Sequence, residues 1–435
     1  MILFGAGASV PLGIPTMEEF VRKFEMEISR SRLLKDFYDQ IKLSITKARE
    51  FTGRDWTFDL ESLMAVLEDI AGVEKTSISP PTIAFISYQL KSGKLQDWSI
   101  KESRMMFSYL ANEMLNKLRY FVVKACAEPL TKIECEDFDR YYGPIFKLLG
   151  KSAARTVFSS VSQWIFTTNW DICLKAWLEC IGEEFDDGFV LDRSKKTILN
   201  PHAGWQGKRF NLIHLHGSID SVKIERSRIG GRYEDILKVS GAHKYLLHYF
   251  KGNPEEIERI FMIYPLEVVG YENSVRSPYL DMLNILRNVL MRENTVFVIG
   301  FSFRDVTISS IFEDVLRVKA ERNEWFPIKT KKLENRAKEA KNMPLKLVII
   351  DPNPEKILKN LEKQGFYNIP KACIPIKAKL PKIDSSRFEE EYSSFLTSVG
   401  EKLVEMNYIG SSALQDVFKN IRESYGLPLP AVTES

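Results

Sequence analysis

Five short apolar runs, each followed at once by a glycine or a polar turn, constrain the fold of this chain most strongly. Runs this short and this continuously apolar are typical of strands that are buried on both faces of a parallel sheet. Stretches of helical periodicity separate several of them, and this alternation indicates an α/β fold. The runs occupy residues 2–4, 164–167, 211–215, 295–299 and 345–350.

The turns at the ends of these runs indicate where a ligand binds, because doubly wound, Rossmann-like parallel sheets bind ligands at the carboxyl ends of their strands. The first turn, Gly5–Ser9, lacks the third glycine of a GxGxxG motif and the lysine of a P-loop. Alone, this turn is compatible with a dinucleotide-binding site but does not identify the nucleotide or the reaction. Thr16 and Glu19 have the spacing of a capping box, so we expect the turn to open a helix, as a phosphate site requires.

The same patterns predict the domain organisation. We expect a Rossmann-like domain over residues 1–383, interrupted by a large helical insertion at 31–152 and a small, less regular insertion at 221–290. A C-terminal helical tail at 384–435 completes the chain. Apolar stripes at helical spacing support the helical insertion and the tail.

Composition and charge exclude several classes of protein. The 61 Lys and Arg residues nearly balance the 58 Asp and Glu residues, which gives no argument for a nucleic-acid partner or an acidic membrane surface. The lysine-rich stretch 329–346 contains Glu334 and Glu339, and we interpret it as a solvated loop or helix face. No apolar run reaches the roughly 18 residues of a membrane span, and no basic region precedes the apolar start. We expect a cytoplasmic protein with no membrane contact and no direct nucleic-acid binding.

The cysteines predict neither a metal site nor a disulfide framework. No Cys-x-x-Cys pair occurs, and Cys173 and Cys180 are interpreted as small buried apolar residues on one helix face. We therefore expect reduced thiols and no bound metal. The five cysteines are Cys126, Cys135, Cys173, Cys180 and Cys373.

Taken in order, the turns resemble the motifs of the sirtuin superfamily, with NAD as the ligand that this resemblance implies. The matching segments are Gly5–Ser9 followed by Gly13–Pro15, then Thr167–Asp171, His216–Gly217, Gly300–Ser302 and Asn353. The residues thereby expected to bind NAD are Gly5, Ala6, Gly7, Ser9, Pro15, Thr168, Gly300, Ser302, Asp305 and Asn353. For Asp305 a second interpretation is equally open, as the partner of Ser302 at a helix start.

Departures from the sirtuin pattern narrow the resemblance. Sirtuin deacylases carry two Cys-x-x-Cys pairs that form a zinc ribbon, and this chain has none. Thr16-Met17-Glu18 follows Gly-Ile-Pro, where the deacylases have Asp-Phe-Arg, and the helical insertion is also unlike them. These features resemble the sirtuin-like NADases of prokaryotic antiviral systems, which implies that NAD⁺ is a substrate for hydrolysis.

Asn169, His216 and Asp171 are the candidate catalytic residues. Cleavage of the nicotinamide–ribose bond passes through an oxocarbenium-like state, so the site must hold the ribose and deliver water. Asn169 offers a neutral donor and acceptor for this purpose. His216 accepts a proton near neutral pH, and Asp171 fixes Asn169 or bonds near the nicotinamide.

Two other classes of function stay open at this point. An NAD-dependent ADP-ribosyltransferase or protein deacylase shares the first half-reaction, and a non-catalytic scaffold or nucleic-acid-binding subunit shares the fold. An active NADase needs restraint, so we expect a homo-oligomer or control by a HerA-type ATPase, the latter through family resemblance alone. The apolar stripe of the last helix, from Leu414 to Ile421, is expected to contact another subunit or partner.

Overall fold

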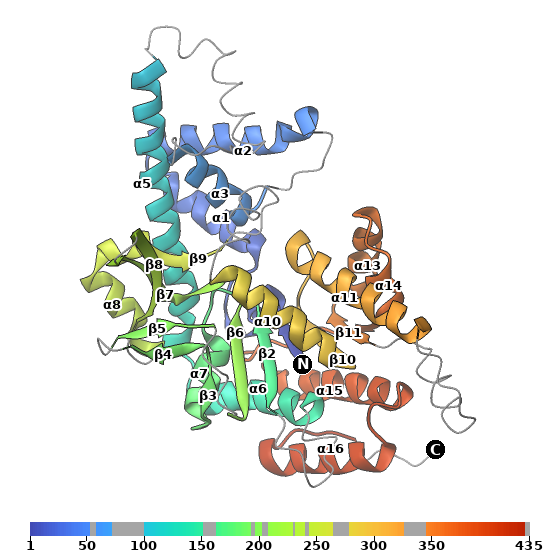
Figure 1. Ribbon diagram of the computed structural model, residues 1–435. Coiled ribbons are helices and arrows are strands. Elements are labelled where there is room, and N and C mark those ends of the chain that lie inside the picture. The colour runs from blue at the N-terminus through green and yellow to red at the C-terminus, as the bar shows by residue number, and fades with distance from the viewer. Residues whose placement is uncertain are drawn as a thin grey trace. The chain divides into compact units, whose positions relative to one another are not determined.

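Seven parallel strands form one sheet, in the order β12-β11-β10-β1-β2-β6-β3, in the computed structural model of this protein (Figure 1). This confirms the predicted α/β class, and all five apolar runs are strands of the sheet. β1 lies in the middle of the sheet, with β2, β6 and β3 on one side and β10, β11 and β12 on the other, so the sheet is doubly wound. Its strands are β1 (Ile2–Phe4), β2 (Gln163–Thr167), β3 (Phe185–Asp186), β6 (Phe210–His214), β10 (Thr295–Ile299), β11 (Lys346–Asp351) and β12 (Cys373–Lys377).

The chain divides into two units. The first contains the parallel sheet and consists of Met1–Ile14, Pro129–Gly217 and Pro278–Ser435, and the second consists of Pro15–Glu128 and Ser218–Ser277. The structure describes residues 1–52, 58–71, 100–150, 162–192, 196–201, 208–228, 231–239, 243–263, 278–325 and 345–430. The lysine-rich stretch lies almost entirely outside these described residues.

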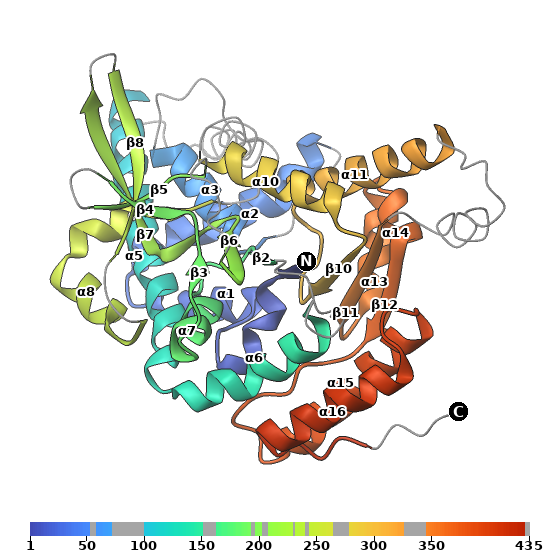
Figure 2. The same cartoon turned by 60° about the horizontal axis from the view of Figure 1, so that its bottom comes forward.

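Helices cover the sheet of the first unit through large buried side chains. The rings of Phe146 and Trp177 stack with centroids 4.4 Å apart, and Phe4 on β1 lies 6.0 Å from Phe146. Figure 2 shows two later helices, α13 and α14, beside β11 and β12. The helices of this unit are α6 (Cys135–Leu149), α7 (Cys173–Cys180), α10 (Tyr279–Arg292), α11 (Val306–Trp325), α13 (Pro354–Lys363), α14 (Asn368–Ala372), α15 (Phe388–Glu405) and α16 (Ser411–Tyr425), and a hairpin pairs β4 (Phe189–Leu191) with β5 (Thr197–Leu199).

The two C-terminal helices pack side by side and against α6 within the chain (Figure 2). Leu414, Phe418 and Ile421 of α16 are at most 1% exposed. Gly400 of α15 leaves room for two of them, since a Cβ there would lie 2.7 Å from the Phe418 ring and 2.9 Å from Leu414. The apolar stripe that predicted a contact with another subunit is therefore covered by this chain itself, and oligomerisation stays a prediction.

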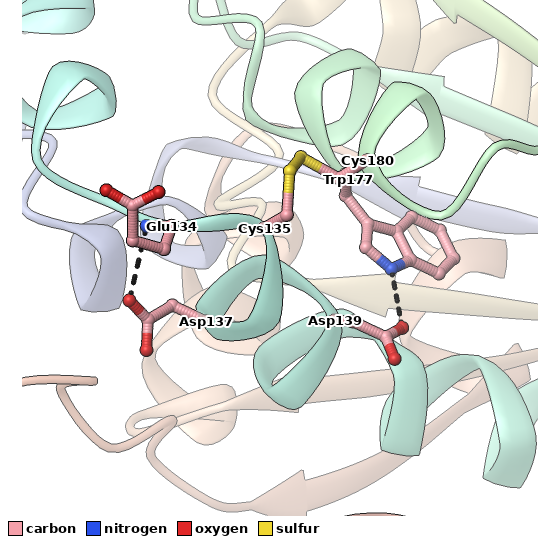
Figure 3. Close-up of a disulfide and its surroundings, with 6 residues drawn as sticks. All are labelled: Glu134, Cys135, Asp137, Asp139, Trp177 and Cys180. Atoms are coloured by element: carbon pink, nitrogen blue, oxygen red, sulfur yellow. Dashed lines mark hydrogen bonds between the residues drawn. A yellow bond between two sulfur atoms is a disulfide. The ribbon is translucent and has the colours of Figure 1, made fainter.

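A disulfide joins Cys135 at the start of α6 to Cys180 at the end of α7, with the two Cα atoms 5.2 Å apart (Figure 3). The expectation that all cysteines are reduced is wrong for this pair. The cysteines are 45 residues apart, and only the packing of α6 on α7 brings them together. Asp139 on α6 adds a second link, because it accepts a hydrogen bond from the Trp177 ring nitrogen at 3.1 Å (Figure 3).

The second unit contains the helices and strands between these segments. The capping box predicted at its first helix is confirmed, because the Glu19 N–H donates to Thr16 Oγ1 and the Thr16 N–H donates to Glu19 Oε2. None of the helices in the described ranges has the length and apolar composition that crossing a bilayer requires. The elements are α1 (Met17–Ile28), α2 (Arg32–Thr52), α3 (Leu60–Ala71), α5 (Ile100–Ala127), an antiparallel pair of β7 (Gly217–Arg228) and β8 (Gly231–Lys238), α8 (Leu246–Gly252) and β9 (Ile260–Met262).

Candidate functional site

The register of the parallel sheet places the ends of four strands in one row. Phe4 of β1 pairs with Thr167 of β2 and with Ile299 of β10, and Thr167 pairs with His214 of β6. Residues that follow these positions by one or two places therefore gather at the carboxyl edge of the sheet, where doubly wound folds bind ligands. These residues are Gly5, Asn169, His216 and Gly300.

Two glycine turns touch each other at this edge. The Gly5 N–H donates to the Ile299 carbonyl at 2.9 Å, and the Gly7 N–H donates to the Gly300 carbonyl at 3.0 Å. Gly300 has a left-handed backbone, with φ at +64°. A Cβ on Gly5 would lie 2.5 Å from the Phe301 Cα, so a side chain does not fit at this contact. The glycines let the two loops approach each other closely.

The first turn differs from a phosphate-binding loop in two ways. The N–H groups of Gly5 and Gly7 bond to protein carbonyls, although we expected them to hold a ligand. The turn also forms two short 3-10 helices, Ala6–Ala8 and Val10–Leu12, before α1 begins at Met17. Pro15, another expected ligand-binding residue, is buried and belongs to the second unit.

Asn169 is held at the edge of the sheet by its amide nitrogen. Nδ2 donates to the Gly5 carbonyl at 3.0 Å and to Ser9 Oγ at 2.9 Å, and the residue is 8% exposed. Oδ1 is buried and meets no hydrogen-bond partner within the part of the chain that the structure describes. Because a buried carbonyl oxygen without a partner costs free energy, Oδ1 is a strong candidate for contact with a ligand.

Two tyrosines of α6 support this arrangement, and the sequence reasoning missed both. The Tyr141 hydroxyl donates to the Ala8 carbonyl at 2.7 Å, and the ring of Tyr142 packs edge-on against Phe4 of β1. Burial raises the pKa of both phenols well above the usual range, with nearby Cys173 and Asp171 adding to the effect. Both therefore stay neutral, and Tyr141 holds the turn that carries Ser9 through the Ala8 carbonyl. Their sequence signal was two consecutive tyrosines within one helix.

His216 pairs with Asp305, a residue from the turn after β10. Nε2 of the imidazole lies 2.7 Å from Asp305 Oδ2, and the two residues are 2% and 3% exposed. Asp305 also caps α11, because its Oδ1 accepts the Ile308 N–H at 3.0 Å. The sequence allowed a ligand-binding role or a role as the partner of Ser302 at a helix start. In the structure Asp305 caps the helix itself and contacts His216, and the Ser302 hydroxyl contacts Arg304 instead. The helix accordingly begins at Val306.

The other predicted residues on the same turns have local roles in this structure. Asp171 is buried, and its Oδ1 accepts the Cys173 N–H at 3.0 Å at the start of α7. The Thr168 N–H donates to the Phe4 carbonyl at 3.1 Å and so ties the turn after β2 to β1. His214 contacts the Asn169 carbonyl through Nδ1 at 3.2 Å. These contacts fix the peptide on either side of Asn169.

Ser302 and Asn353 are both exposed. Ser302 Oγ accepts a hydrogen bond from Arg304 Nε at 3.2 Å. Asn353 precedes α13, and its N–H donates to Asp351 Oδ1 at 2.7 Å. Among the described residues, no group of three or more His, Cys, Asp or Glu side chains is placed to hold a metal ion. The buried part of the site therefore consists of Asn169, His216 and their partners.

Comparison with known proteins supports a sirtuin-like family. Residues 163–348 match the family model of the SIR2-like domain. The matched range includes the turns that carry Asn169, His216 and Asp305, and leaves out the first glycine turn and Asn353. A search of curated proteins found no match to this chain. The SIR2-like domain implies binding or use of NAD.

Proposed function

We propose that this protein is an NAD⁺ glycohydrolase that produces nicotinamide and ADP-ribose. The observation that supports this most directly is the buried Oδ1 of Asn169, which is fixed in place through Nδ2 and has its hydrogen-bonding capacity left for a ligand. A ribose hydroxyl or a water molecule fits this acceptor. His216 follows the neighbouring strand at an equivalent position and supplies a group that can accept a proton.

Asn169 and His216 have different roles in the proposed reaction. Cleavage of the C–N bond leaves its electron pair on nicotinamide, which departs as a neutral molecule. Asn169 holds the ribose or the water through Oδ1. His216 accepts the proton that water releases as its oxygen bonds to the ribose carbon. General-base help of this kind contributes about 100- to 10,000-fold to a rate.

The wider biological role rests on the resemblance to prokaryotic antiviral NADases. We propose that NAD⁺ depletion during infection is the outcome, and that self-assembly or a HerA-type ATPase partner restrains the activity beforehand. The absence of Cys-x-x-Cys pairs from the sequence argues against a deacylase with a zinc ribbon. Transfer of ADP-ribose to an acceptor other than water is an outcome that the assay below distinguishes.

Purified full-length protein incubated with NAD⁺ tests the proposal. We expect free nicotinamide and ADP-ribose in equal amounts, and Asn169→Ala and His216→Ala should each lower turnover at least about 100-fold. Asn360→Ala on α13 and His248→Ala on α8 remove the same residue types from exposed positions and serve as matched controls. Release of nicotinamide without an equal amount of free ADP-ribose would indicate that ADP-ribose is transferred to an acceptor other than water. No nicotinamide across a wide range of protein concentrations would refute the proposal.

A further inference from the structure

We infer that Asp305 is a positioning residue that holds His216 in the Nε2–H tautomer and leaves Nδ1 as the nitrogen that takes the proton. The inference rests on the proposed function for the reaction that it serves. Its structural part concerns the imidazole alone, which can be examined without NAD⁺.

The contact between the two side chains determines the tautomer. An ionised carboxylate only accepts hydrogen bonds, so the nitrogen 2.7 Å from Asp305 Oδ2 must carry the proton. In a neutral imidazole the other nitrogen, Nδ1, is then the acceptor. Nδ1 is buried and finds no hydrogen-bond partner in the described ranges. The basic nitrogen is thus free to take a proton from a ligand or from water.

Asp305 is itself fixed through its second oxygen and its backbone. Oδ1 accepts the Ile308 N–H at 3.0 Å, and the Ser309 N–H donates to the Asp305 carbonyl at 2.9 Å. The N-terminus of α11 stabilises the negative charge of the carboxylate. Since each carboxylate oxygen has its own partner, rotation of the side chain would break two hydrogen bonds at once.

The backbone two residues before Asp305 is strained. Phe303 has a left-handed backbone, with φ at 55°, a conformation that is unfavourable for a bulky residue. The hydroxyl of Ser309 holds it by donating to the Phe303 carbonyl at 3.0 Å. Buried rings also pack on Phe303, with Phe301 at 4.9 Å and Phe312 at 5.5 Å between centroids. Such strain persists where surrounding contacts impose it, and it is concentrated at functional sites.

Other titratable groups that the structure places near the pair add no second negative charge beside His216. Burial raises the pKa of Tyr279 on α10, and the negative charge of Asp305 raises it further, so this phenol stays neutral. His214, the last residue of β6, lies two residues before His216 and contacts the Asn169 carbonyl. Asp305 is therefore the anion that contacts His216.

Nitrogen NMR of the ligand-free, full-length protein with ¹⁵N-labelled histidine tests the inference. The signals of His216 are assigned by their loss in His216→Gln. At mildly alkaline pH we expect Nε2 to be protonated and Nδ1 to be bare. The reverse pattern in the wild-type protein would overturn the inference, and this measurement needs neither turnover nor a second variant.

The variant Asp305→Asn should invert the tautomer while keeping the fold. An asparagine that still caps α11 through its oxygen turns its NH₂ group toward Nε2, which must then be bare, so the proton moves to Nδ1. Asp314→Asn is the matched control, because it removes a carboxylate of the same helix that contacts Arg287 and Arg317 instead. It should leave the His216 signals unchanged. Unaltered His216 signals in Asp305→Asn would also overturn the inference.

Turnover separates this inference from the proposed function. With wild-type activity established, Asp305→Asn should lower NAD⁺ turnover about 100- to 10,000-fold, and Asp314→Asn should not. An inactive wild type with the expected NMR pattern would refute the proposed function and leave the positioning role intact. An active wild type with full turnover in Asp305→Asn would refute the positioning role alone.

Discussion

Substitution of Gly300 by alanine tests whether the two glycine turns touch as the structure shows. A Cβ at Gly300 would lie 2.5 Å from the Ala8 nitrogen and 2.7 Å from the Gly7 carbonyl carbon. Both are backbone atoms, which cannot move aside by rotating a side chain. We therefore expect Gly300→Ala to destabilise the protein through a steric clash as well as through its left-handed backbone.

A second glycine separates these two contributions. Gly426, which ends α16, has φ at +67°, nearly the same as the +64° of Gly300. A Cβ at Gly426 meets no described atom within 4 Å. Gly426→Ala should thus cost only the conformational strain of about 1–2 kcal/mol. Gly300→Ala adds about 1–3 kcal/mol for overpacking, which gives a total of about 2–5 kcal/mol.

Urea unfolding followed by tryptophan fluorescence measures the difference. Trp164, Trp170 and Trp177 lie in the same unit as Gly300 and report on its unfolding. We expect the free energy of unfolding of Gly300→Ala to be about 1–3 kcal/mol lower than that of Gly426→Ala. Equal values for the two variants would show that the loops do not approach closely, and would refute the explanation given for the glycine at this position.

Two further predictions concern residues of the first unit. Cys180→Ser should lower the free energy of unfolding by about 4 kcal/mol, because the disulfide to Cys135 closes a loop of 45 residues. Dithiothreitol should lower the wild type to the same value, and equal free energies of unfolding for the variant and the wild type without reductant would contradict the disulfide. Burial raises the pKa of Asp351 although the Asn353 N–H bonded to it acts in the opposite direction, so ionisation of Asp351 costs stability as the pH rises above about 4. Asp351→Asn should therefore raise the urea midpoint of unfolding at neutral pH and leave it unchanged at low pH. An equal increase of the midpoint at the two pH values would exclude ionisation of Asp351 as the cause.

Several features of the fold could be predicted from the sequence because they depend on neighbouring residues. The run from Thr295 to Ile299 is a strand with the predicted bounds, and the capping box at Thr16 forms as expected. The resemblance to sirtuin motifs selected Asn169 and His216 as candidates, and their place after apolar runs predicted that both lie at one edge of a parallel sheet.

The tertiary structure decided how these candidates are held and what the remaining residues do. Asp305 lies 89 residues from His216, and no local pattern indicates that its carboxylate contacts that imidazole as well as capping a helix. The disulfide and the covered stripe of α16 were mispredicted for the same reason, since each depends on packing against α6. Local sequence determines which segments are strands and where helices begin, because hydrogen bonding and side-chain periodicity act over a few residues. Which distant side chains meet depends on how those segments pack, and that is a property of the whole chain.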